Sequence, residues 1–278
     1  MPSPRLRGEG APERSEGADE GRCYDPQCME SPVVEVTVQQ SAIGRIVVPP
    51  KVPKGFAVFY TTLDFHGRLD QPNGELLSGV IREQFGITAT ITSCTQIHGT
   101  TVRRAEAHPR FRECDSCDAL WSRDKQTALA IKIADCLPVS LIDPRRSVIA
   151  NIHSGWRGAV RRITAATLDA LDRGTHFDAA TAYAWLGPSI RACCFEVGEE
   201  VADQFQDSYQ NADRYIDRSH TKPHIDLAGL TVAVLRERGL APERIIDSGL
   251  CTRCEGSLFH SYRRDGAKGG RNLAIVAQ

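Results

Sequence analysis

Short apolar runs alternate with amphipathic segments along most of the chain. Runs that are rich in β-branched residues and bounded by turn-forming residues are typical of strands. Such runs occur at residues 34–38, 55–61, 89–94, 128–133, 138–142 and 148–152. We therefore predict a domain in which buried sheets form a large part of the core.

Three segments carry apolar residues at spacings of three and four, which predicts helices with one buried face. The first spans 75–85 and ends before Gly86, a favourable left-handed cap. The second follows Gly155 and continues to about residue 172, and the third begins at Asp226 and stops at Gly239. Strands alternating with helices indicate a layered α/β domain.

Residues 1–32 are rich in Gly, Glu, Arg, Ser and Pro and contain hardly any aliphatic side chains. Such a segment buries too little apolar surface to offset the entropy of ordering, so we predict a disordered tail. Its Cys23 and Cys28 have no neighbouring ligands and are given no role. Residues 33–278 contain no internal repeat and no Gly/Ser-rich linker, which favours a single domain.

The overall composition excludes several classes of partner. Lys and Arg total 34 against 35 for Asp and Glu, so no global charge steers the chain toward nucleic acid or an anionic membrane. Neither a signal peptide nor a membrane-length apolar run is visible, which predicts a cytoplasmic protein. The 10 cysteines are dispersed, and without a secretion signal they are interpreted as reduced thiols, some of them metal ligands.

Three potential metal ligands stand at the ends of predicted strands: His98, Cys136 and His153. Imidazole and thiolate are the usual ligands of Zn²⁺, and a catalytic zinc site keeps a fourth position open. Taken singly, each residue has an ordinary alternative, since a lone histidine is usually a surface residue and a lone cysteine is often a small buried one. A shared zinc site is the chemical hypothesis that unites them.

Short motifs surround these residues, and others follow further along the chain. They are Gln96-Ile97-His98-Gly99, Ala134-Asp135-Cys136-Leu137-Pro138, His153-Ser154-Gly155-Trp156-Arg157-Gly158, Leu186-Gly187-Pro188-Ser189-Ile190, Cys193-Cys194-Phe195-Glu196-Val197-Gly198, Cys251-Thr252, Phe259-His260-Ser261-Tyr262-Arg263-Arg264-Asp265-Gly266 and Gly270-Arg271. In this order and spacing they resemble the signature blocks of the YfiH, or laccase-domain, family, and the resemblance runs from about residue 88 to the end of the chain.

The resemblance implies a layered α/β/β/α sandwich, similar to the catalytic domain of the cytotoxic necrotizing factors. It places the family's metal ligands on His98, Cys136 and His153. Family members have been described as polyphenol oxidases or laccases, as purine nucleoside phosphorylases with adenosine deaminase activity, and as a peptidoglycan editing factor. Multicopper oxidases need many histidines, often in His-x-His pairs, whereas this chain has 8 His and no such pair, so we disfavour copper.

A single zinc with an open position suits purine nucleoside chemistry, because zinc activates water in other deaminases. The hypothesis is phosphorolysis of adenosine, guanosine or methylthioadenosine to base and sugar 1-phosphate, with adenosine deamination as a side activity. Cys136, His153 and His98 form the catalytic centre, and the Asp135 carboxylate is expected to transfer a proton. The candidates for binding phosphate are Arg157, Arg263, Arg264 and Arg271. Arg157 stands out because it follows His153 at the start of a helix.

The sequence departs from its relatives in two places. The family's Arg-x-Gly-Gly-Val-Ser stretch is missing, and residues 60–67 read YTTLDFHG instead, which leaves open a different nucleoside substrate. Two Cys-x-x-Cys pairs with zinc-ligand spacing are also present. A structural zinc site is hypothesised at Cys114, Cys117, Cys251 and Cys254.

Two rival functions remain open on the sequence. Cys136 as a thiolate nucleophile, with His153 or His98 as its base, would make a cysteine hydrolase or amidase without a metal. A non-catalytic factor that edits peptidoglycan precursors by association would require an exposed aromatic patch, and aromatics make up only 6% of the chain.

Overall fold

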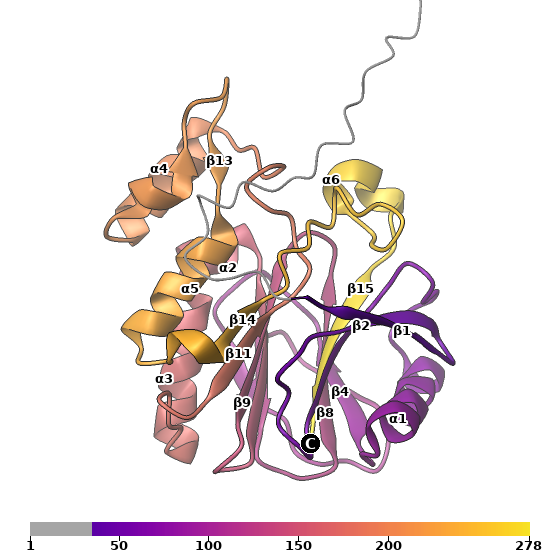
Figure 1. Cartoon of the computed structure of the whole chain (residues 1–278). Coiled ribbons are helices and arrows are strands. Elements are labelled where there is room, and N and C mark those ends of the chain that lie inside the picture. Colours follow the sequence, from indigo (N-terminus) through magenta and orange to yellow (C-terminus); the bar gives the residue numbers. More distant parts are fainter. Residues whose placement is uncertain (1–34) are drawn as a thin grey trace, which may run out of the picture.

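A computed structural model describes residues 35–278 and shows two sheets packed between layers of helices (Figure 1). The predicted tail and the cysteines at positions 23 and 28 lie outside the described residues. One sheet has the strand order β1-β2-β3-β15-β8-β4-β6 and the other β14-β11-β9-β10-β7-β5. Helix α1 covers the outer face of the first sheet, and α3 and α5 cover the outer face of the second (Figure 1). The predicted α/β/β/α sandwich is confirmed.

The bounds of the elements are as follows. The first sheet comprises β1 Thr37–Ser41, β2 Gly44–Val48, β3 Ala57–Thr61, β4 Thr90–Cys94, β6 Arg112–Cys114, β8 Thr127–Ile133 and β15 Asn272–Ala277. The second comprises β5 Val102–Arg104, β7 Ala119–Ser122, β9 Leu137–Asp143, β10 Val148–Ser154, β11 Tyr183–Leu186 and β14 Ile245–Asp247, and a two-stranded ribbon pairs β12 Ile216–Asp217 with β13 His224–Ile225. The helices are α1 Gln71–Phe85, α2 Trp156–Val160, α3 Ile163–Thr175, α4 Glu199–Ser208, α5 Leu227–Glu237 and α6 Tyr262–Asp265.

The alternation of side chains along the strands divides the interior into three cores. On β8, Ala128 and Ala130 face α1, whereas Leu129 and Ile131 face the second sheet. Successive side chains of a strand point to opposite faces, so a strand covered on both sides is apolar throughout. This explains why the β8, β9 and β10 segments are continuous apolar runs in the sequence.

Helix α5 begins and ends where the sequence indicated, whereas α1 ends at the predicted Gly86 but begins four residues before the predicted residue 75. Asp70 caps α1 by accepting from the backbone N–H of Asn73, and Gly86 ends it at a φ of 68°. Asp226 caps α5 in the same way through Gly229, and Gly239 follows with a φ of 91°. Glycine adopts positive φ without the steric cost that other residues incur, so both stops are explained by residue type.

Two predictions of secondary structure need correction. The strand expected at residues 34–38 is β1 at Thr37–Ser41, where it pairs with β2. The continuous helix expected after Gly155 is two helices, α2 and α3, because Arg162 between them adopts a left-handed backbone with a φ of 64°. The apolar spacing runs through this break and therefore conceals it.

A buried asparagine connects the two sheets. Asn151 lies on β10, and its Nδ2 donates to the carbonyl of Leu129 on β8 at 2.9 Å and to that of Ala274 on β15 at 2.8 Å. Its Oδ1 accepts from the Ser140 hydroxyl at 3.2 Å. All of the polar atoms of this amide therefore have partners, as an amide buried between two apolar sheet faces requires.

Replacing Asn151 by Ala is expected to lower the free energy of unfolding by about 2–4 kcal/mol, because it removes three buried hydrogen bonds and leaves their partners buried. Urea denaturation measures the change. Gln40→Ala, at an exposed position of β1, is the control and is expected to have little effect. Equal stability of Asn151→Ala and the wild type would show that the bridge contributes nothing.

Candidate functional site

The three predicted ligands come together at one end of the two sheets. Ligand atoms of His98, Cys136 and His153 all lie within 4.8 Å of one another. The Cys136 Sγ is 4.0 Å from His98 Nε2, and the two imidazole rings meet edge to face with centroids 4.8 Å apart. Ligands at 2.0–2.3 Å from a tetrahedral zinc would be separated by about 3.6 Å, so this donor set fits a zinc ion closely.

A side-chain amide fixes the loop that carries His98. Gln96 donates to the carbonyl of Lys132 on β8 and accepts from its backbone N–H, both at 2.8 Å. This double contact has the hydrogen-bonding pattern of a strand pair, and it attaches the loop after β4 to the neighbouring strand. Two residues later His98 adopts a positive φ of 58°, which turns the chain at the ligand itself.

The carboxylate of Asp118 orients two of the ligands. It accepts from the backbone N–H groups of His98 at 2.8 Å and Gly99 at 2.7 Å, and it contacts Nδ1 of His153 at 2.9 Å. Because Nδ1 of His153 is engaged, Nε2 is the nitrogen left for Cys136 or a metal ion. A carboxylate behind a ligating histidine is a common way to fix the ring and raise its basicity.

Close packing around Cys136 requires glycine at position 155. A Cβ atom at Gly155 would lie 3.0 Å from both the Cys136 Sγ and the His98 ring. Any side chain there would displace two of the three ligands. The glycine of the His-Ser-Gly-Trp-Arg-Gly motif is therefore explained by the lack of room for a side chain beside Cys136 and His98.

The electrostatics of the site favour a thiolate. Burial raises the pKa of the Cys136 thiol, but hydrogen bonds to His153 and His98 and their positive charges outweigh it, and the pKa falls to about 6. Burial lowers the pKa of His153, but Asp118 and Cys136 act in the opposite direction and raise it to about 9. The thiolate is the form of cysteine that binds metals and attacks electrophiles.

A cavity of about 750 Å³ opens in front of the three ligands, within the size range of small-molecule sites. Trp156, Ile190, Phe195, Leu227 and Tyr262 give it apolar walls. Its other lining residues are Thr95, Gln96, His98, Glu113, Lys132, Ala134, Asp135, Cys136, His153, Arg157, Arg263 and Arg271. The site thus combines a ligand group, apolar surface and positive charge.

Three of the four predicted arginines line this cavity. Arg157 stacks on the Trp156 ring at 4.4 Å, and Arg271 lies over Tyr262 at 5.9 Å. Arg263 lies over Phe195 and donates to the carbonyls of Cys194 and Glu196. Among the described residues no ion pair holds these three guanidinium groups. Arg157 lies in the first turn of helix α2, as expected, and because α2 has only five residues the contribution of a helix dipole there stays a prediction.

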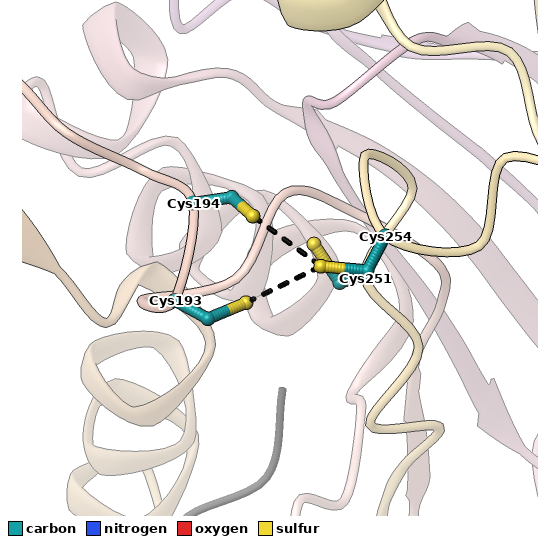
Figure 2. A group of neighbouring side chains, drawn as sticks. All are labelled: Cys193, Cys194, Cys251 and Cys254. Atoms are coloured by element: carbon teal, nitrogen blue, oxygen red, sulfur yellow. Dashed lines mark hydrogen bonds between the residues drawn. The ribbon is translucent and has the colours of Figure 1, made fainter. Parts of the chain in front are cut away.

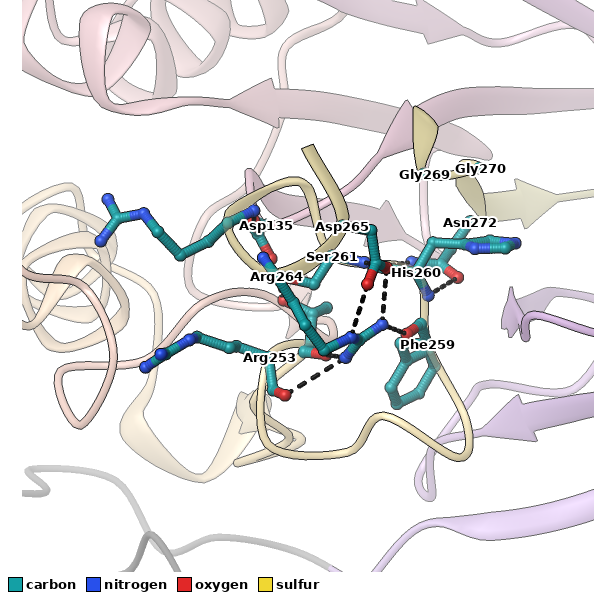
Figure 3. A network of polar contacts seen from close by, with 12 residues as sticks. Asp135, Arg253, Phe259, His260, Ser261, Arg264, Asp265, Gly269, Gly270 and Asn272 are labelled. Atoms are coloured by element: carbon teal, nitrogen blue, oxygen red, sulfur yellow. Dashed lines mark hydrogen bonds and ion pairs between the residues drawn. The ribbon is translucent and has the colours of Figure 1, made fainter. Parts of the chain in front are cut away.

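Arg264 is placed differently from the other three arginines. It donates to the carbonyls of Phe259, Thr252 and Arg253 and is paired with Asp265 at 2.8 Å (Figure 3). It is absent from the cavity lining. Its prediction as a phosphate ligand is therefore corrected, because its donors already hold the loop between β14 and α6.

Asp135, the residue predicted to transfer a proton, lies in the cavity lining beside Cys136, and its role in proton transfer stays a prediction. One carboxylate oxygen accepts from the Thr252 hydroxyl at 2.6 Å and the other from the Arg263 backbone N–H at 2.6 Å. Its own carbonyl accepts from the backbone N–H of Ile190. Asp135 lies on the cavity wall with both oxygens engaged, so it braces two loops beside Cys136.

The second predicted metal site does not form as proposed. Within the described part of the chain, Cys251 and Cys254 gather with Cys193 and Cys194, and neither Cys114 nor Cys117 is in that group. Cys117 instead lies beside Cys94, whose thiol is 3.3 Å from the Cys117 carbonyl. The Cys-x-x-Cys spacing indicated metal ligands but could not show which pair faces which.

Comparison with known proteins identifies the family. The sequence model of a family described as "Multi-copper polyphenol oxidoreductase laccase" matches residues 77–278. The chain belongs to this laccase-domain family. Over 186 residues it is 38% identical to adenosine deaminase RL5 of an unknown prokaryotic organism, covering 63% of this chain and 70% of that protein. It is 34% identical to purine nucleoside phosphorylase YlmD of Bacillus subtilis, over 57% of this chain and 58% of that one.

The fold of this laccase-domain protein agrees with a solved relative. The crystal structure of YlmD from Geobacillus stearothermophilus superposes with a TM-score of 0.75 at 23% identity, covering 88% of this chain and 99% of that one. No described helix of the laccase-domain protein has the length and apolar character needed to cross a bilayer.

Asp118 was not predicted as a site residue, because it lies outside the three signature motifs that carry the ligands. Its only local signal is a carboxylate directly before the buried strand β7. An ionised group at such a position needs partners, and these come from residues 20 and 35 positions away. The partners could not be identified without the fold.

Asp118→Asn is expected to weaken zinc binding by about 10- to 100-fold, because the amide no longer orients His153 or accepts from both backbone N–H groups. Competition with a chromophoric chelator measures the affinity. Asp115→Asn, at an exposed position three residues earlier, is the control and is expected to bind zinc as the wild type does. Unchanged affinity in Asp118→Asn would contradict the assigned role.

Proposed function

We propose that this protein is a zinc-dependent purine nucleoside phosphorylase that also deaminates adenosine. The observation that carries the proposal is the convergence of His98, Cys136 and His153 on a cavity whose rim holds three arginines. Two imidazoles and one thiolate with space in front of them match the ligand set of a catalytic zinc. The names of the relatives, a purine nucleoside phosphorylase and an adenosine deaminase, support the same chemistry.

The donor set argues against a multicopper enzyme. The ligand group contains only two histidines and one cysteine, and the other cluster found among the described residues consists of cysteines alone. Copper clusters of oxidases require many imidazoles. Zinc is the metal proposed here, and when bound it supplies a Lewis acid that polarises an oxygen atom of the reactants.

The protein's own groups provide the remaining functions. Trp156, Phe195 and Tyr262 offer aromatic surface to a purine ring, which has two flat apolar faces. Arg157, Arg263 and Arg271 offer guanidinium groups to phosphate oxygens. Phosphorolysis needs both at once, because the phosphate attacks the anomeric carbon while the purine base departs.

A second function is favoured by one specific observation. Cys136, His153 and Asp118 form a line of thiol, imidazole and carboxylate, the arrangement that activates a cysteine nucleophile. A cysteine hydrolase or amidase, including one that edits peptidoglycan precursors, would use these residues without a metal. The same geometry therefore supports two reactions, and comparing the activity of the protein with and without bound zinc distinguishes them.

Zinc-loaded protein is expected to convert adenosine and phosphate to adenine and ribose 1-phosphate, and to form some inosine when phosphate is omitted. Chromatography of the products measures both reactions. Removal of zinc, or the Cys136→Ser substitution, is expected to abolish them because the ligand group is lost. If fully zinc-loaded protein forms neither product, the proposal is rejected. If metal-free protein hydrolyses amides, and iodoacetamide abolishes that activity, the cysteine hydrolase is favoured instead.

Arg271→Ala and Arg157→Ala are each expected to raise the KM for phosphate about 10-fold or more, because a charged hydrogen bond contributes about 1.5–3 kcal/mol. Deamination uses no phosphate, so its kcat/KM is expected to change by less than about twofold, within ordinary context dependence. Arg161→Ala, on an exposed residue beside α2, is the matched control. If Arg271→Ala and Arg157→Ala lose phosphorolysis and deamination equally, these arginines bind the nucleoside or stabilise the fold and do not bind phosphate.

A further inference from the structure

Four cysteine thiols gather at a second place on the protein, outside the cavity lining. They are Cys193 and Cys194, in the loop between β11 and α4, and Cys251 and Cys254, in the loop after β14. Their sulfur atoms all lie within 4.8 Å of one another, and side chains from the two loops point toward a common centre (Figure 2). No residue of this group belongs to the site proposed for nucleosides.

The distances between these sulfurs suit a metal ion. The Cys254 Sγ is 3.9 Å from the Cys193 Sγ and 3.3 Å from the Cys194 Sγ. Four sulfurs at 2.3 Å from a tetrahedral zinc are separated by about 3.8 Å. The observed distances bracket this value, and small side-chain rotations reach it. A disulfide joins two sulfurs at about 2.0 Å and would leave the other two thiols unused.

The backbones that carry the thiols are already attached to each other. Ser189 and Cys251 form a parallel β-bridge, in which Ser189 donates to the Leu250 carbonyl and accepts from the Thr252 N–H. The Cys251-x-x-Cys254 turn is closed by the Glu255 N–H, which donates to the Cys251 carbonyl at 2.9 Å. Thiols two residues apart on a tight turn are the commonest half of a structural zinc site.

Burial and charge at the cluster support an ion that is shielded on one side. Cys194 and Cys251 are buried, whereas Cys193 and Cys254 reach the surface. Four thiolates around Zn²⁺ carry a net charge of about −2, which a neighbouring cation would offset. Arg253, the residue between Cys251 and Cys254 in the sequence, is an exposed cation on the same turn.

We propose that Cys193, Cys194, Cys251 and Cys254 bind a structural zinc ion, separate from the site at His98, Cys136 and His153. Binding replaces four thiol protons with one Zn²⁺ and changes no oxidation state. The ion joins two loops that both contact Asp135, one through the Ile190 N–H and the other through the Thr252 hydroxyl. It therefore stabilises the cavity wall next to Cys136.

Metal analysis of the full-length, reduced protein tests this site without relying on activity. The wild type is expected to hold two zinc equivalents and Cys254→Ser one. Cys114→Ser, at a cysteine outside both groups, is the matched control and is expected to keep two. His98→Asn is expected to lose the other equivalent and keep the four-thiolate ion, which cobalt substitution reveals by strong sulfur-to-cobalt absorption.

Thiol labelling of the wild type provides a second measurement should Cys254→Ser fail to fold. In zinc-loaded protein Cys193 and Cys254 are expected to resist alkylation despite their exposure, and to react at least about tenfold faster after chelation, because zinc-bound thiolate is withheld from the reagent. Labelling rates that do not depend on zinc would overturn the proposal. So would a single zinc equivalent in the wild type that His98→Asn removes, or a disulfide within the group under reducing purification.

The two proposals in this protein fail separately. Loss of the four-cysteine ion leaves the ligands His98, Cys136 and His153 intact, so nucleoside activity can be present when the structural zinc is absent. If the wild type holds two zinc equivalents but forms no nucleoside product, the structural zinc site is supported and the phosphorylase activity is rejected.

Discussion

The Asp118 carboxylate is the interaction on which the candidate site depends. It is fully buried and lies where the loop after β4, from one sheet, meets the end of β10, from the other. It holds the His98 backbone and the His153 ring at once, and the Asp118 carbonyl accepts from the His153 N–H at 2.7 Å. Burial raises the pKa of this carboxyl, but its hydrogen bonds to His153 and to the backbone lower it below the usual range. A permanent negative charge between the sheets therefore positions two ligands that would otherwise belong to separate layers.

How much could be predicted from the sequence depended on the range of the interactions. Helices α1 and α5 were predicted because Gly86 and Asp226 act within one turn. The central strand β15 was missed, although it is buried on both faces like the predicted strands β8, β9 and β10. The ligands of the candidate site were found through motifs, whereas Asp118 and the partners of Cys251 depend on contacts between distant segments. Arg264 shows the converse, because residue type suggested phosphate binding, whereas its donors are occupied by backbone carbonyls and by Asp265.

The candidate site balances two properties of one thiol. The surroundings that lower the pKa of Cys136 to about 6 would make it a nucleophile when no metal is present, and a ligand when one is. Asp118 and Cys136 raise the pKa of His153 to about 9, so the charged form of the imidazole is favoured beside the thiolate. The cavity in front of them is large enough for a nucleoside and carries positive charge on its rim.

The position of β15 has a consequence for how the protein is made. Residues 272–277 lie between β3 and β8 and complete the centre of the first sheet, while Thr252 and the Arg263 N–H are needed to brace Asp135. Contacts between segments more than 200 residues apart close late and slowly, because the intervening chain must first be ordered. A nascent chain lacking these residues would expose the apolar faces of β3 and β8 to solvent and to other chains. Completion of the first sheet and bracing of the cavity wall beside Cys136 therefore both need residues 252–277.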